Sequence, residues 1–264
     1  MKKIKWLVGL IVVVLAVTPA AADFYVIAGG GRVGTQISSL PYTISTPGFY
    51  YLANNLTFTG ATVNGITVNA SDVTLDLMGF CLIGPGKEAG VHRGISIPEN
   101  QSNVEIRNGS LSNWETGIVS FSAGICNGVR VICIRVRETK YDRISLSAAD
   151  LGTNHLVTGC SVMLAGGNGI LAGNGSLVKG NHVARNNGHG IWAMPGCTVE
   201  GNVAQTNGGS GINALAGCTV TRNTAYNTTG TGIATGNDCT ITNNTTDGLT
   251  KGSNCTDANN TITP

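Results

Sequence analysis

The second half of this 264-residue chain repeats itself every 21 residues. Three segments begin at Cys197, Cys218 and Cys239, and in each of them Thr follows Cys directly and Asn stands five residues after it. Two apolar columns keep the same step: Val157, Val178, Val199, Val220 and Ile241 form one, and Ile170, Ile191, Ile212 and Ile233 form the other. A fixed period of this length indicates a solenoid, in which each repeat is one structural unit stacked on the next.

Each period contains three short extended runs separated by turn residues. In residues 197–217 the runs are 197–199, 203–205 and 212–214, and Gly and Asn stand between them. No 3.6-residue periodicity is present, so helices are not expected. We therefore predict an all-β chain folded as a parallel β-helix, a single-stranded solenoid of about eight to nine coils with three short strands per coil.

The repeated columns indicate which side chains face inward. Val, Ile and Cys alternate with polar residues along each run, so they are expected to stack in the core. The four asparagines of the repeat are expected at a corner, each amide bonded to the amides above and below. The apolar columns extend upstream with longer steps, through Val73, Val104 and Val131 and through Ile66, Ile95, Ile118 and Ile144. The asparagines are Asn181, Asn202, Asn223 and Asn244.

Charged residues are scarce and exclude several classes of protein. They make up 11% of the chain, and the formal net charge is +2. Coiled coils, helical bundles and nucleic-acid binders need many more charged side chains. The 42% of hydrophobic residues also argues against disorder, because such a chain can bury a core.

The first residues have the pattern of a secretory signal peptide. Lys2, Lys3 and Lys5 precede an apolar run over residues 6–17, and three alanines follow at 20–22. The run is shorter than the roughly 20 residues that span a bilayer. We expect residues 1–22 to be removed after Ala22, which gives a secreted or periplasmic chain without membrane insertion and with a net charge of −1.

Three segments follow from these patterns: the signal peptide at 1–22, an N-terminal cap with entry strands at 23–64, and the β-helix at 65–264. The step from Cys239 to Cys255 shortens to 16 residues, and the residues around it are polar. The last segment is therefore expected to end in a short polar closing coil.

The repeated pattern Gly-Ile-x-x followed by Val-x-x-Asn resembles the right-handed parallel β-helix repeats of the pectate-lyase-like superfamily, over residues 65–264. Residues 40–52, 65–68 and 72–79 are similar to the opening of exported bacterial NosD-type β-helix proteins. The resemblance implies a right-handed helix. It leaves activity open, because the superfamily includes lyases, hydrolases, epimerases, tailspikes and proteins without activity.

The densest group of charges suggests a binding site for an acidic sugar. It contributes a net charge of +3 within 14 residues, and its structural alternative is a solvated outer loop of a longer coil. Arg135 is expected to stack with Ser161 and His182 on an outward face, with Arg135 and His182 two coils, about 10 Å, apart. Trp192 is also expected to point outward, where an indole ring stacks on sugars. The group comprises Arg130, Arg135, Arg137, Glu138, Lys140, Tyr141, Asp142 and Arg143, and the predicted substrate-binding residues are Arg135, Arg137, Lys140, Tyr141, His182 and Trp192.

The thiols and imidazoles do not predict a metal or cofactor. Cys197, Cys218 and Cys239 are expected to be buried, reduced and free of metal, because thiols in line do not converge on one tetrahedral ion. His182 and His189 are expected on different faces of one coil. The tripeptide 188–190, Gly-His-Gly, occurs in polygalacturonase-type hydrolases, but the acidic motifs of that family are absent, so we interpret His189 as a corner residue. The other histidines are His92 and His155.

The sequence favours an exported, non-catalytic scaffold or carbohydrate-interacting protein. One alternative is a polysaccharide lyase or related enzyme acting on an acidic glycan, with the charged group at 130–143 as its site. A second alternative, implied by the resemblance, is a periplasmic accessory protein for a copper site. The expected partner is an acidic polysaccharide and not a nucleic acid, and the oligomeric state stays open.

Overall fold

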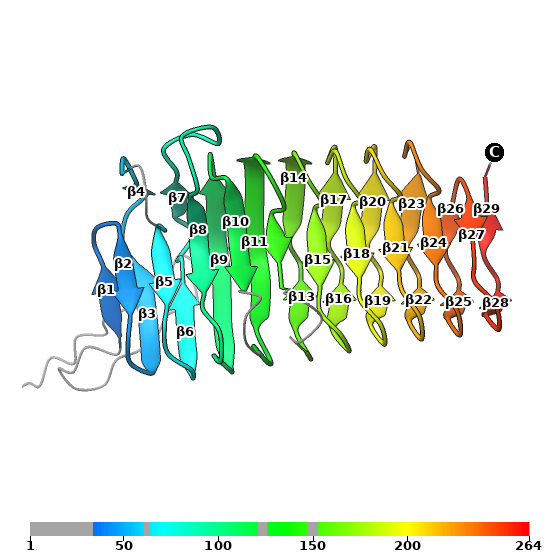
Figure 1. Ribbon diagram of the computed structural model, residues 1–264, viewed down its shortest axis with the longest axis horizontal. Coiled ribbons are helices and arrows are strands. Elements are labelled where there is room, and N and C mark those ends of the chain that lie inside the picture. Colours follow the sequence, from blue (N-terminus) through cyan, green and yellow to red (C-terminus); the bar gives the residue numbers. More distant parts are fainter. Residues whose placement is uncertain (1–33, 61–63, 121–125, 147–152, 227, 264) are drawn as a thin grey trace, which may run out of the picture. The chain divides into compact units, whose positions relative to one another are not determined.

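The computed structural model describes residues 34–60, 64–120, 126–146, 153–226 and 228–263. The predicted signal peptide and residues 23–33 of the predicted cap lie outside these ranges. The described residues contain strands and no helix, and the strands stack into a solenoid (Figure 1). The described residues accordingly form no helix long and apolar enough to cross a membrane.

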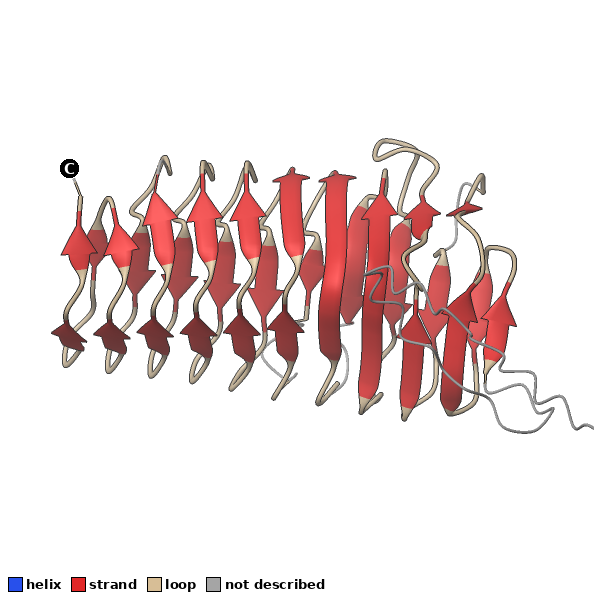
Figure 2. Ribbon diagram, turned by 180° about the vertical axis from the view of Figure 1, so that it is seen from behind, coloured by secondary structure: helices blue, strands red, loops and turns tan. Residues whose placement is uncertain are grey.

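The strands form three faces that run along the solenoid. Faces 1 and 2 belong to one 19-stranded sheet, because β9 (Val104–Ser112) and β11 (Arg130–Thr139) run through the corner between them (Figure 2). Face 3 is a separate ten-stranded sheet. All pairings are parallel, and this confirms the predicted β-helix.

Most strands are two to five residues long. Face 1 comprises β1 (Thr35–Ile37), β3 (Gly48–Leu52), β6 (Val73–Asp76), β13 (Leu156–Thr158), β16 (Leu177–Lys179), β19 (Thr198–Glu200), β22 (Thr219–Thr221), β25 (Thr240–Thr242) and β28 (Thr256–Ala258). Face 2 comprises β4 (Leu56–Thr57), β7 (Cys81–Ile83), β14 (Ser161–Ala165), β17 (His182–Ala184), β20 (Val203–Gln205), β23 (Thr224–Tyr226), β26 (Thr245–Thr246) and β29 (Thr261–Ile262). Face 3 comprises β2 (Tyr42–Ile44), β5 (Ile66–Val68), β8 (Arg93–Ile97), β10 (Thr116–Ser120), β12 (Ile144–Ser145), β15 (Ile170–Ala172), β18 (Ile191–Ala193), β21 (Ile212–Ala214), β24 (Ile233–Thr235) and β27 (Leu249–Thr250).

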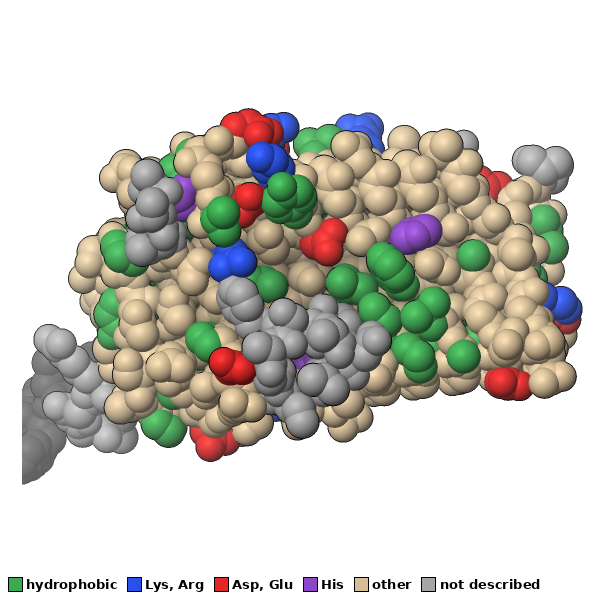
Figure 3. All heavy atoms as spheres, viewed as in Figure 1, with side chains coloured by type: hydrophobic (Ala, Val, Ile, Leu, Met, Phe, Trp, Pro, Cys, Tyr) green, Lys and Arg blue, Asp and Glu red, His purple; other side chains and the backbone are tan. Residues whose placement is uncertain are grey.

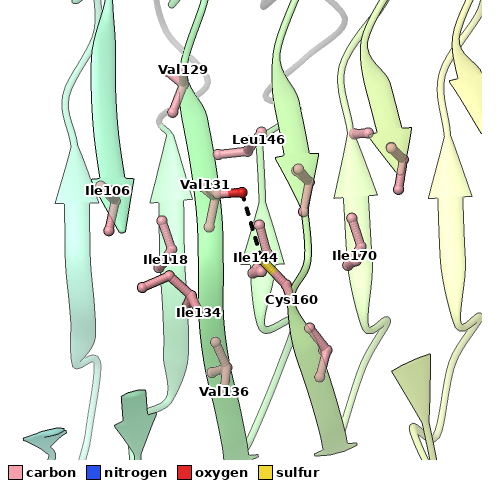
Figure 4. Close-up of a cluster of buried hydrophobic side chains, with 14 of the residues drawn as sticks. Ile106, Ile118, Val129, Val131, Ile134, Val136, Ile144, Leu146, Cys160 and Ile170 are labelled. Carbon is pink, nitrogen blue, oxygen red and sulfur yellow. Dashed lines mark hydrogen bonds between the residues drawn. The ribbon is translucent and has the colours of Figure 1, made fainter. Parts of the chain in front are cut away.

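The predicted inward columns are present. Val157, Val178, Val199, Val220 and Ile241 are in register and fully buried, and the isoleucine column runs without a break from Ile66 to Ile233. Figure 4 shows the core between coils, where the Cys160 thiol donates to the Val131 carbonyl at 3.6 Å.

The upstream register of the valine column was predicted wrongly by two residues. Val131 pairs with Ile106, and Ile106 pairs with Leu75. Val104 and Val73 pair with each other and lie two residues earlier on the same inward face. The error arises because two residues is the period of a strand, so both positions are apolar and buried.

Two ladders of buried asparagines run inside the corners. At the corner between faces 1 and 2, the Nδ2 of Asn181 donates to the Oδ1 of Asn202 at 2.9 Å, and the same contact continues through Asn223 and Asn244 to Asn260. This confirms the predicted amide column. A shorter ladder joins Asn186 to Asn207 at 3.0 Å, at the corner between faces 2 and 3.

Both ends of the described solenoid consist of paired strands. β1 pairs with β3 and β2 pairs with β5, so coil pairing begins within residues 34–64. At the other end β28 pairs with β25 and places Asp257 in register with the buried Ile241. Lys251 Nζ contacts the Asp257 carboxylate at 2.6 Å, so an exposed ion pair lies at the end of this column.

The charged group at 130–143 is not an outer loop. Its first ten residues form β11, with side chains alternating between the core and solvent. Arg143 was expected to be solvated, but it is fully buried. It occupies the position that Gly117 and Gly169 hold in the neighbouring coils, where a Cβ points into the core.

Candidate functional site

A groove follows the corner between faces 2 and 3. Its larger cavity has a volume of about 590 Å³ and is lined by Lys87, Glu88, Glu138, Lys140, Tyr141 and Arg185, among others. A second cavity of about 320 Å³ shares Arg185 and Asn187 with the first and continues across the next coils. We call these two cavities together the corner groove.

The stacking of the corner turns explains the bare floor of the groove. Gly166 and Gly208 line it at positions where a Cβ would collide with a backbone carbonyl of the preceding coil, that of Lys140 or Asn187. Side chains are therefore excluded there, and backbone atoms form the floor. Lys140 and Tyr141 lie one coil before Gly166 and stand at the end of the groove.

The loop between β7 and β8 supplies the opposite wall. Lys140 Nζ lies 3.2 Å from the Glu88 carboxylate of this loop, and the contact raises the pKa of Lys140. The same ammonium lies 5.6 Å from the centre of the Tyr141 ring, which is 52% exposed. Figure 3 shows charged side chains gathered along this upper edge of the molecule.

Arg185 projects from the end of β17 into both cavities. It has a positive φ of 55°, a conformation shared by Glu138 and Leu164 at the same position of the two preceding coils. Arg185 is exposed, and among the described residues no ion pair neutralises it. The groove therefore offers a guanidinium to an incoming anion.

Three of the predicted site residues lie on face 2, outside the corner groove. Arg135 is in register with Ser161, and Ser161 with His182, as predicted. Arg137 is in register with Met163 on the same face. The Gln205 amide nitrogen lies 3.2 Å from His182 Nε2, and the Tyr226 hydroxyl donates to the Gln205 carbonyl oxygen.

Trp192 lies on face 3, in register with Leu171 and Asn213. It is half-buried and meets His189 edge to face, with the ring centres 5.6 Å apart. His189 Nδ1 accepts the Ser210 N–H at 2.9 Å, and burial lowers the pKa of His189. His189 is thus a corner residue, held by the turn of the next coil.

The predicted site residues therefore lie on three surfaces. Lys140 and Tyr141 line the corner groove, Arg135, Arg137 and His182 stand on face 2, and Trp192 stands on face 3. The sequence did not indicate Lys87, Glu88 or Arg185. The sequence could have indicated Arg185, because this arginine follows His182 at a corner where the later repeats have small or polar residues.

The cysteines of the repeat are buried, as predicted, and the structure holds them as free thiols. In the part of the chain that is described, no three His, Cys, Asp or Glu residues gather as a metal site. The acid in the corner, Asp142, accepts the Asn168 N–H at 2.6 Å, and burial raises its pKa. These groups stabilise turns of the solenoid.

The sequence and the structure both match known β-helices. Residues 93–262 match the family model described as "Right handed beta helix region". No curated protein matches the chain.

Three solved structures are similar in fold. The A-module of mannuronan C-5 epimerase AlgE4 from Azotobacter vinelandii has a TM-score of 0.64 at 11% identity, and the alignment covers 80% of this chain and 66% of that one. The AlgE6 A-module of the same organism has a TM-score of 0.52 at 12% identity and coverages of 75% and 67%. The enzymatically active domain of tailspike protein 2 from bacteriophage CBA120 has a TM-score of 0.54 at 17% identity, with coverages of 83% and 38%. The chain spans about two thirds or less of the length of these structures, and at such identities the likeness establishes the fold alone.

Proposed function

The chain belongs to the right-handed β-helix family, and from this premise we propose that it is an exported, non-catalytic protein that binds an acidic carbohydrate in the corner groove. The observation that carries the proposal is the exposed Tyr141 ring at the end of a groove that also contains Lys140 and Arg185. The similar structures named as mannuronan C-5 epimerases support a carbohydrate as the ligand.

The chemistry of the groove suits a sugar that carries a carboxylate or sulfate. An exposed tyrosine ring stacks on the apolar face of a pyranose ring. Arg185 offers a planar pair of donors to an anionic group, and hydrogen bonds between charged partners are the stronger kind. Since Lys140 already contacts Glu88, Arg185 is the principal anion-binding residue in this proposal.

The carboxylates of the chain favour binding over cleavage. Hydrolysis of a glycosidic bond uses a pair of carboxyl groups placed on either side of that bond. Glu88 is paired with Lys140, and Glu200, the single carboxylate of residues 151–237, is held by both Lys179 and Arg222. Glu88 and Glu138 both line the groove, and because Lys140 already holds Glu88, one of the two carboxylates that such a pair would need is engaged.

A lyase with its site on face 2 is a second candidate. It is favoured by the linked side chains of Tyr226, Gln205 and His182, and by Arg135, which lies two coils before His182 on the same face. A lyase needs a base for the proton beside the uronate carboxyl and a cation for that carboxyl. However, the Gln205 amide donates to His182 Nε2, so the lone pair that would take the proton is already engaged. For a copper-site role we find no supporting cluster among the described residues.

The test is binding of the chain from residue 23 onward to polyuronates and to neutral glucans. We expect the protein to bind polyuronates, and to bind them more weakly at high salt. Tyr141→Ala and Arg185→Ala should each lower the affinity roughly tenfold or more, and for Arg185 the reason is that losing one charge-assisted hydrogen bond costs at least a factor of ten. Arg135→Ala is the matched control, because it removes an exposed arginine outside the groove. Unchanged affinity in Arg185→Ala would refute the groove. Loss in Arg135→Ala together with an ultraviolet-absorbing unsaturated product would establish the lyase instead.

A further inference from the structure

Four cysteines form one column at the corner between faces 3 and 1. Each precedes a face 1 strand, and the residues that follow them, from Thr198 to Thr256, are in register from coil to coil. Each thiol donates to a backbone carbonyl of an earlier turn: Cys197 to Gly173 at 3.1 Å, Cys218 to Met194 at 3.3 Å, Cys239 to Leu215 at 3.2 Å and Cys255 to Gly236 at 3.1 Å.

Cys255 makes the number of stacked thiols even. In the sequence it falls outside the 21-residue step, because it follows Cys239 by 16 residues, and three thiols in a row would leave one without a partner. The structure restores the register by shortening the corner between faces 2 and 3, so Cys255 stacks on Cys239 like any other pair.

Cys239 and Cys255 lie close enough for a covalent bond. Residues in register on neighbouring strands are about 4.8 Å apart, and disulfides join Cα atoms separated by about 4.4–6.8 Å. The N–H of Cys239 lies 3.4 Å from the Sγ of Cys255, so the second sulfur is directed at the first residue.

The position of this pair at the end of the solenoid sets it apart from the two upstream thiols. Cys197 and Cys218 are buried between coils on both sides. Cys255 belongs to the closing coil at the C-terminal end (Figure 1), is only partly buried, and has a paired coil on one side. An oxidant therefore reaches Cys255 first, and the closing coil, which is paired on one side, can adjust when the bond forms.

We propose that Cys239 and Cys255 are a disulfide-forming pair that fastens the closing coil to the solenoid. The Cys255 thiolate attacks a small-molecule disulfide such as oxidised glutathione, which forms a mixed disulfide and releases one glutathione thiolate. The Cys239 thiolate then attacks the Cys255 sulfur, and the second glutathione leaves. Two cysteine thiols are oxidised and one glutathione disulfide is reduced to two thiols, so atoms and electrons balance.

The bond replaces two weak thiol hydrogen bonds by a covalent closure of the last coil. Strands β28 and β29 are short and exposed, and they are paired on one side. Closing a loop of this size restricts the unfolded chain, which favours the folded state. This inference is independent of the corner groove, which the pair does not touch.

The test is peptide mapping of the folded chain after equilibration in a glutathione buffer of the oxidising ratio found in exported compartments. Trypsin cuts after Arg185, Arg222 and Lys251, so Cys239 and Cys255 fall into peptides 223–251 and 252–264. Cys133 is exposed at another corner, and Cys133→Ser is used as the background to remove its adducts.

We expect a loss of two hydrogens from the intact mass and a linked pair of peptides 223–251 and 252–264. Reductant should lower the melting temperature of this protein but leave that of its Cys255→Ser variant unchanged, because serine keeps the bond to the Gly236 carbonyl and cannot be oxidised. An unchanged mass, a lasting glutathione adduct on Cys255, or a link between 186–222 and 223–251 would each overturn the proposal.

Discussion

The two halves of the solenoid bury different groups at the same corner. In the regular region, residues 153–263, the corner between faces 1 and 2 holds the asparagine ladder that begins at Asn181. In the irregular region, residues 34–146, the equivalent position is Gly109 in one coil and Ile134 in the next. The polar contacts between successive coils of the irregular region are ion pairs of face 1 side chains, where Arg107 bonds the buried Asp76 at 2.8 Å and Arg130 bonds Glu105 at 2.9 Å.

The difference follows from the length of the repeat. A buried amide is favourable only if its donors and its acceptor are all met, because an unsatisfied buried group costs about 1–3 kcal/mol. A constant 21-residue step places an identical amide one coil away, so the Oδ1 of each asparagine accepts hydrogen bonds from the asparagine of the preceding coil. In the irregular region the steps of the isoleucine column vary from 23 to 29 residues, and apolar corners, which need no partner, tolerate that variation.

The largest expected effect tests what the two regions share, the inward apolar column. Val199→Asp places a charge in a fully buried position of the regular region. We expect a loss of about 5 kcal/mol or failure to fold, since an unpaired charge would enter the core. Denaturant unfolding measures the loss. Thr198→Asp, on the outward side of the same strand, is the control and should cost about 1 kcal/mol or less. Equal losses would mean that the strand does not alternate as described.

Breaking the ladder should have the next largest effect. Asn202→Ala removes the acceptor of two Asn181 donors and the donor to the Val178 carbonyl. The Asn202 amide also donates to Asn223 Oδ1, so four buried hydrogen bonds would be lost, and we expect a loss of about 4 kcal/mol. Asn260→Ala ends the same ladder at a half-buried position where water can substitute, so about 1 kcal/mol is expected. If both variants unfold at the same denaturant concentration, the ladder is not what distinguishes the regular region.

Sequence reasoning predicted the parts of this fold that depend on period. The valine, isoleucine and asparagine columns were visible because identical residues return at a constant step. Cys255 and the upstream valines were harder to place, because loops of different length hide the register, and a shift of two residues keeps a strand's pattern. The corner groove was hidden for another reason: Lys87 and Glu88 come from a loop two coils before Lys140, and a repeat pattern says nothing about where a loop folds.

The junction of the two regions should be sensitive to acid. His155 is buried, its Nδ1 accepts the Val129 N–H from the irregular region, and its backbone N–H donates to the Ser176 hydroxyl in the regular one. Burial lowers the pKa of His155 from 6.5 to about 4. The unfolded chain therefore binds more protons between these values, and stability present above pH 6.5 is lost as the pH falls toward 4.

The loss attributable to His155 should reach about 3 kcal/mol at pH 4, from about 1.4 kcal/mol per pKa unit. Unfolding free energies measured from pH 7 to pH 4 check this. His155→Asn retains an acceptor without titrating in this window, and its stability should fall less with acid than that of the parent. Parallel pH profiles for the two proteins would contradict a neutral, buried His155.

Replacing Arg143, in the irregular region, should have the smallest effect and is the only change expected to increase the free energy of unfolding. Its neighbours in the column, Gly117 and Gly169, carry no side chain, whereas the guanidinium of Arg143 is fully buried. None of its three nitrogens has a hydrogen-bond partner among the described residues, and burial lowers the pKa of Arg143 to about 9. A buried charge without a partner opposes folding, and apolar replacements of buried ionic groups stabilise some proteins by about 1–4 kcal/mol.

We expect Arg143→Met to raise the unfolding free energy at pH 7 by about 1 kcal/mol, because methionine fills part of the same space without charge. The advantage should shrink as the pH rises through 9, where the parent begins to lose the buried proton that the unfolded chain still holds. Arg135→Met, on the exposed face of β11, should change stability by less than about 0.5 kcal/mol. A destabilised Arg143→Met would show that the guanidinium has a partner in the folded protein, and that this corner of the irregular region is polar after all.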